Sequence, residues 1–149
     1  MKKTALFLSA LILALTGCGK SEKPRVYTFS GTNDDLMITD GEITISDKSE
    51  KMYSGNLVIQ SDIPENTAYY TMEYYVIVNG EKEVIMKNKS DDFTRIEPDK
   101  CYENVSIEGD ILSDGAKENI ESLCFVLKTV DADGNTSEYT LKPEVTEKQ

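Results

Sequence analysis

From residue 25 onward, apolar and polar residues alternate with a period of two over much of the chain. This period is typical of β-strands that are buried on one face only. In the longest run, Ala68–Val78, one face of the strand carries Tyr70, Met72, Tyr74, Val76 and Val78. The pattern predicts strands at Arg25–Ser30, Leu36–Thr39, Glu42–Ser46, Asn56–Gln60, Ala68–Val78, Lys82–Lys87, Asn104–Leu112, Leu123–Asp131 and Thr136–Leu141.

Turn residues separate these runs. Asp40-Gly41 is expected to form a turn between two strands, and Asn79-Gly80 the tip of a hairpin, because these residue types tolerate positive φ angles. Ala132–Asn135 is expected to close a second hairpin. Only Asp114–Glu121 has a helical composition, enough for one or two turns, and Pro143–Gln149 is predicted to be a polar tail that frays.

Seven to nine strands, spaced by about ten residues, predict an all-β fold in which two antiparallel sheets form a sandwich. The sequence shows no repeat, internal linker or low-complexity tract that would divide it. We therefore expect one β-sandwich domain over residues 25–142, followed by the tail at 143–149.

The first 17 residues have the features of a secretion signal. Lys2 and Lys3 give a positive start, and Ala5–Leu15 is an uninterrupted run of apolar or small residues. A helix of this length rises about 16 Å, which is about half the thickness of a bilayer's hydrocarbon core. The segment therefore favours a cleaved signal peptide over a membrane-spanning helix.

Leu15, Thr16, Gly17 and Cys18 follow this run and resemble the lipobox of bacterial lipoproteins. The resemblance implies that a diacylglyceryl group alkylates the Cys18 thiol, that the signal is cleaved before Cys18, and that fatty acids such as palmitate anchor the chain. Residues 18–24 would then be the lipidated end and its polar tether. Several acyl chains hold a protein stably at a membrane. An ordinary secretory signal and an uncleaved short anchor are the alternatives.

A second resemblance lies at the start of the predicted domain. Phe29, Gly31 and Asn33 match a Phe-x-Gly-x-Asn motif that small lipoproteins of Gram-positive bacteria carry soon after the tether, although Leu36 stands where that group has Trp. The resemblance implies an immunoglobulin-like sandwich at the cell surface. Together with the lipobox, it implies a lipid-anchored protein on the extracytoplasmic face of the cell membrane, in a Gram-positive organism.

The charge of the chain narrows the choice of partners. Its formal net charge is −11, and removal of Lys2 and Lys3 with the signal makes it −13. Nucleic acid is excluded as a partner, because phosphate binding needs a concentrated basic surface. An acidic domain is also repelled by anionic lipids, so the lipid anchor is expected to provide the membrane contact.

The residues needed for common catalytic sites are missing. Without histidine, neither a Ser-His-Asp triad nor a Cys-His pair can form, and no Gly-x-Ser-x-Gly, Ser-x-x-Lys or glycine-rich phosphate loop is present. Adjacent acids such as Asp34-Asp35 and Asp91-Asp92 are expected to be solvated surface. We expect no catalytic residue, metal or cofactor; a hydrolase that uses an acid pair is the distant alternative.

Two sets of residues leave structural alternatives open. Cys101 and Cys124 are an even pair once Cys18 is acylated, so they can form a disulfide outside the cytoplasm or stay as two thiols. Asp131–Asn135 contains the acids and glycine of a calcium loop, but it lacks the Gly and Glu that an EF-hand needs at its sixth and twelfth positions. Tight-turn chemistry accounts for the same residues.

Tyr69, Tyr75 and Ile77 lie on the face of the long predicted strand opposite its apolar side. If this face is exposed, it offers an amphipathic docking surface; if the strand is central, both faces are covered. The sequence thus favours a membrane-anchored, non-enzymatic module that binds a protein or envelope component. A structural or accessory lipoprotein, which assists folding or transport of envelope proteins, is the alternative.

Overall fold

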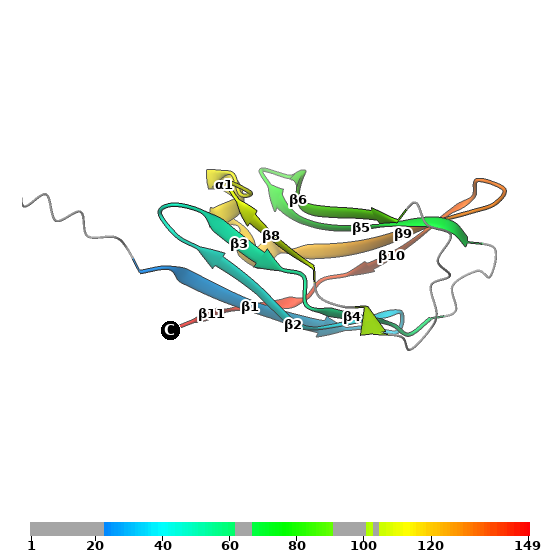
Figure 1. Cartoon of the computed structure of the whole chain (residues 1–149), viewed down its shortest axis with the longest axis horizontal. Coiled ribbons are helices and arrows are strands. Elements are labelled where there is room, and N and C mark those ends of the chain that lie inside the picture. The colour runs from blue at the N-terminus through cyan, green and yellow to red at the C-terminus, as the bar shows by residue number, and fades with distance from the viewer. Residues whose placement is uncertain (1–22, 62–66, 91–100, 103–104) are drawn as a thin grey trace, which may run out of the picture.

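The computed structural model describes residues 23–61, 67–90, 105–149 and the backbone of 101–102, which form two antiparallel β-sheets packed face to face (Figure 1). The predicted all-β sandwich is confirmed. The signal and lipobox residues, Leu15 to Cys18 among them, lie outside the described residues. Within the described part, no helix has the length and apolar character to span a membrane.

The larger sheet has the order β11–β1–β2–β3–β8, and β4 pairs with β2 and with β7. Its strands are β1 (Arg25–Thr32), β2 (Leu36–Ile45), β3 (Glu50–Tyr53), β4 (Asn56–Ile59), β7 (Cys101–Tyr102), β8 (Ser106–Gly109) and β11 (Glu144–Lys148).

The smaller sheet has the order β10–β9–β5–β6. Its strands are β5 (Thr67–Val78), β6 (Glu81–Ser90), β9 (Cys124–Asp131) and β10 (Thr136–Leu141). The predicted helical stretch is confirmed as two short pieces between β8 and β9, α1 (Asp114–Glu118) and the 3-10 turn η1 (Ile120–Ser122).

The core lies between the sheets, and β5 supplies its centre. Tyr74 is buried with its ring against Phe29 of the larger sheet and Phe125 of the smaller one, at centroid distances of 5.6 and 4.8 Å. Its hydroxyl donates a hydrogen bond of 2.6 Å to the Ser54 carbonyl across the sandwich. The inward face of β5 that the alternation predicts is thus confirmed.

The turn predicted at Asp40-Gly41 is wrong. β2 runs through both residues, because one half of it pairs with β4 and the other with β3. Asp40 has φ 58°, and the pairing of β1 with β2 shifts register between Phe29 and Gly31, so the strand bends without reversing. The Phe29 ring occupies the space that a Cβ on Gly41 would need.

The frayed tail predicted at Pro143–Gln149 is also wrong. Residues 144–148 form β11, which pairs antiparallel with β1 from Val26 to Ser30. Val145 packs against the core, and Lys148 Nζ lies 2.8 Å from Glu42 Oε2. The segment has an ordered position because it completes the pairing of the first strand.

The structure has more strands than the seven to nine expected. The sequence pattern missed β3, whose inward positions are Glu50 and Met52, because a buried glutamate breaks the apolar alternation. It also missed β7. The strand predicted at Asn104–Leu112 is shorter, at Ser106–Gly109, and Asn104 is outside the described residues.

Candidate docking face on the small sheet

The outward side chains of β5, β6, β9 and β10 form one surface, which we name the small-sheet face. The strand registers place Tyr75 opposite Val84 and Cys124, and Glu73 opposite Lys87 and Val126. The apolar and aromatic members of this face used below are Tyr69, Tyr75, Ile77 and Val84. Its charged members are Glu73, Lys82, Lys87, Lys89, Lys128 and Glu138.

Exposed apolar side chains gather on this face. In the described part of the chain, four large hydrophobic side chains are exposed, and three of them belong to it: Tyr69 at 39 %, Ile77 at 37 % and Val84 at 44 %. The structure therefore places the predicted residues Tyr69 and Ile77 on one face of β5, about 26 Å apart along the strand. The half-buried Tyr75 is next to Ile77 on this face. Val84 is a member that the sequence did not indicate.

A buried carboxylate organises the charges of the face. Glu73 is 6 % exposed, and its two oxygens lie 2.6 Å from Lys82 Nζ and 2.8 Å from Lys87 Nζ. The hydrogen bonds from these two ammonium groups lower the pKa of Glu73 to about 2, against the smaller opposing effect of burial. Glu73 therefore stays ionised and fixes two cations beside each other.

Two lysines lie over tyrosine rings of the same face. Lys82 Nζ is 4.3 Å from the centroid of the Tyr75 ring, and Lys89 Nζ is 5.1 Å from that of Tyr69. Both distances are within the range of cation–π attraction. Each ammonium covers one face of its ring, which leaves less aromatic surface for a flat ligand such as a sugar to stack on.

The β9–β10 side of the face holds another ion pair and a thiol. Lys128 Nζ lies 2.7 Å from Glu138 Oε1. Burial raises the pKa of Tyr75, and the neighbouring Cys124 acts in the same direction. The Cys124 thiol is free and donates a hydrogen bond of 3.4 Å to the Ser122 carbonyl.

The two cysteines begin strands in different sheets. Cys101 pairs with Val58 in the larger sheet, whereas Cys124 pairs with Tyr75 in the smaller one. The side chain of Cys101 lies outside what the structure describes. Cys124 carries a free thiol in this structure, and a disulfide between Cys101 and Cys124 in the oxidised protein stays a prediction.

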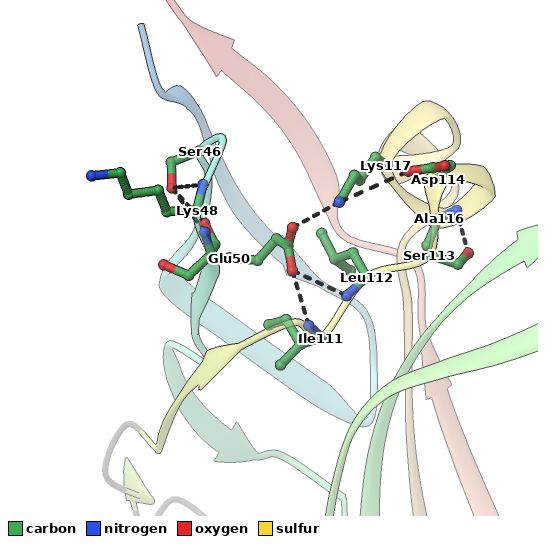
Figure 2. A network of polar contacts seen from close by, with 10 residues as sticks. Ser46, Lys48, Glu50, Ile111, Leu112, Ser113, Asp114, Ala116 and Lys117 are labelled. Atoms are coloured by element: carbon green, nitrogen blue, oxygen red, sulfur yellow. Dashed lines mark hydrogen bonds and ion pairs between the residues drawn. The ribbon is translucent and has the colours of Figure 1, made fainter. Parts of the chain in front are cut away.

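A second polar cluster surrounds Glu50, in a recess of about 440 Å³ beside the start of β1 (Figure 2). One carboxylate oxygen accepts N–H bonds from Ile111 (2.9 Å) and Leu112 (3.4 Å), and the other lies 2.8 Å from Lys117 Nζ. Burial raises the pKa of Glu50, but these donors outweigh it, so the pKa is lowered overall. These contacts connect β3 to α1 and to the segment before it, so we assign the cluster a structural role.

The Asp131–Asn135 loop uses its polar groups within the turn. The Asp131 carboxylate accepts hydrogen bonds from the N–H groups of Asp133 (2.9 Å) and Asn135 (2.8 Å) and from the Asn135 side chain (2.9 Å). The bonds from Asn135 are the main reason that the pKa of Asp131 is lowered. In the part of the chain that the structure describes, no three or more His, Cys, Asp or Glu residues cluster in a way that could hold a metal ion.

No protein-family model matches this chain, and neither does any curated protein or solved structure. The class of protein is therefore defined by its geometry: an all-β sandwich of two antiparallel sheets, with a mixed apolar and charged face on the smaller sheet.

Proposed function

We propose that this chain is a lipoprotein, anchored through Cys18 at the extracytoplasmic face of a cell membrane, and that it is a non-enzymatic module that docks a protein on its small-sheet face. The observation that carries the proposal is that three of the four exposed large hydrophobics in the described residues belong to one sheet face, Ile77 and Val84 near the β5–β6 hairpin and Tyr69 towards the other end of β5. Tyrosine is enriched among the residues that provide most of the binding energy where proteins dock, and covering aliphatic side chains removes apolar surface from water.

The outer face of the larger sheet offers a contrast. Its outward positions include the polar Thr28, Glu42 and Thr146 and the half-buried apolar pair Met37 and Val58. None of the four exposed large hydrophobics of the described residues lies in its strands. Such a surface is well solvated and gains little from being covered by a partner. The difference between the two faces supports the smaller sheet as the docking side.

The anchor makes a weak docking contact sufficient. A tether of six residues, Gly19–Pro24, spans at most about 20 Å. The domain would therefore stay close to the membrane and to the proteins beside it. Confinement of this kind raises the effective concentration of each partner, so a modest intrinsic affinity gives substantial occupancy.

Photo-crosslinking in intact cells tests the docking face. A photoreactive phenylalanine analogue replaces Ile77 in one variant and Thr44, which points outward from the larger sheet, in the matched control. We expect reproducible protein adducts from position 77 only. In the same cells Val84→Glu should reduce the adduct yield, since it places a charge in the apolar contact. Equal adducts from both positions, or none from position 77, would contradict the proposed docking face.

A further inference from the structure

The charge on the small-sheet face opposes that of the whole chain. Within this face Lys82 and Lys87 share the single carboxylate of Glu73 and keep a charge of +1, whereas the complete sequence carries −11. We propose that the partner presents an acidic amphipathic segment to this face, with its carboxylates on Lys82 and Lys87 and its apolar side chains on Ile77 and Val84. This inference rests on the proposed function and adds the chemistry of the partner.

The Lys82–Glu73–Lys87 cluster has a positive charge that its own carboxylate does not neutralise. Two ammonium groups share one carboxylate, so the cluster keeps one positive charge, and each ammonium has three N–H donors. The Lys82 and Lys87 side chains are 36 % and 57 % exposed, whereas that of Glu73 is only 8 % exposed. An incoming carboxylate thus meets the cations, while the anion between them is covered.

The lysines are also held in place before a partner arrives. Glu73 holds Lys82 and Lys87, and the rings of Tyr75 and Tyr69 lie under Lys82 and Lys89. A long side chain that is already ordered loses less conformational entropy on binding. The charged part of the face is therefore pre-organised to bind anions.

The apolar neighbours of these lysines indicate an acidic protein segment in preference to an anionic polymer. Ile77 is the direct partner of Lys82 across the two strands, and Val84 stands opposite Tyr75, so exposed hydrophobic and cationic side chains are interleaved. A polyphosphate would bind the cations and leave the hydrophobic side chains in water. A segment with both carboxylates and aliphatic side chains covers both kinds of group.

A binding titration with defined probes tests this inference. The mature lipidated chain is placed in phosphatidylcholine nanodiscs, which carry no net charge. The probes are a soluble peptide of about ten residues with glutamates around a central Leu-Val pair, the same peptide with Gln for each Glu, and polyphosphate. We expect the acidic peptide to bind more tightly than either other probe, with an affinity that falls as salt is added.

Lysine variants show whether the face itself provides the binding. Lys87→Gln should weaken binding of the acidic peptide by about five-fold, the effect of one partly exposed charge pair. Lys51→Gln is the matched control, because Lys51 also lies over a tyrosine ring, that of Tyr53 at 4.8 Å, but on the larger sheet. Its affinity should equal that of the wild type.

Three outcomes overturn the acidic partner: an unchanged affinity in Lys87→Gln, equal binding of the Gln peptide, or polyphosphate binding as tightly as the acidic peptide. The acidic partner would also be overturned if none of the three probes bound. In each of these cases, adducts that still form from position 77 in cells would leave the docking face in place with a partner of different chemistry. Loss of those adducts too would remove the proposed function.

Discussion

Glu73 and Glu50 are both almost inaccessible, yet the structure supports their charges in different ways. Glu73 lies on the outer side of the smaller sheet and is stabilised by two lysine side chains. Glu50 lies on the inner side of the larger sheet and is stabilised by two backbone N–H groups and Lys117. A buried carboxylate is tolerated only when such donors replace water. The lysines beside Glu73 are more exposed, at 36 % and 57 %, than Lys117 beside Glu50, at 24 %.

The lowered pKa of Glu73 predicts a specific loss of stability in acid. Its pKa is about 2 in the folded chain against an ordinary value of 4.5, so the folded state binds this proton less readily than the unfolded state does. The stabilisation is complete above pH 4.5 and is lost as the pH falls from 4.5 towards 2. We expect this loss to be about 2 kcal/mol, because solvent at the two lysines reduces the full value of the shift.

Urea unfolding between pH 2 and pH 7 measures this contribution. In Glu73→Gln, the free energy of unfolding should be lower than in the wild type at pH 7 and should converge with it at pH 2. Glu138→Gln is the control, since that carboxylate is 52 % exposed and its removal should change the profile little. Parallel profiles for the wild type and Glu73→Gln would show that Glu73 titrates normally.

The sequence could indicate part of the small-sheet face and not the rest. Alternation along one strand was enough to place Tyr69, Tyr75 and Ile77 on the same face. The position of Lys87 opposite Glu73 depends on a register shift between Tyr74 and Tyr75, which accommodates two consecutive buried residues of β6, Ile85 and Met86. Cross-strand register of this kind is a tertiary property, so the period-two pattern does not contain it.

At the scale of whole elements, the successes and failures have physical causes. The Asn79-Gly80 hairpin was predictable because a tight turn needs positive φ at both positions, which Asn and Gly tolerate, and they have values of 53° and 84°. Asp40-Gly41 carries a similar signal, but two partner strands hold β2 in one piece, and pairing overrode the local preference. β11 was missed because its sequence, EVTEK, has a single apolar residue. β11 is held in place by its antiparallel pairing with β1.

β11 should therefore contribute strongly to stability. A chain that ends at Pro143 loses the pairing of β11 with β1, the packing of Val145 and the ion pair between Lys148 and Glu42. We expect it to lose about 3 kcal/mol, which corresponds to a fall of about 10 °C in Tm. Thermal unfolding followed by circular dichroism measures this. Removal of Gln149 alone is the control, and equal Tm values in both truncations would show that β11 adds nothing.

At the scale of the whole molecule, the proposed anchor and the proposed docking face belong to different sheets. The chain enters the sandwich at Arg25 in β1 of the larger sheet, and the end of β11 lies beside that start, at one end of the molecule (Figure 1). The small-sheet face points away from the sheet that holds the tether. A partner in the same membrane would therefore not have to displace the proposed tether to reach this face.

This arrangement depends on acylation of Cys18, which makes a prediction about the complete protein. Cells supplied with a clickable fatty-acid analogue should label the wild type and leave Cys18→Ala unlabelled, because only the lipobox thiol accepts the diacylglyceryl group. Cys124→Ser is the matched control, since it removes a thiol that the structure shows to be free and should keep the full label. Mass spectrometry of the purified wild type should find Cys18 as the first residue.

A native chain that keeps residues 1–17 and carries no acyl group would contradict the anchor. The small-sheet face would then act in solution, where membrane confinement no longer raises the concentration of its partner and the docking affinity itself would have to be higher.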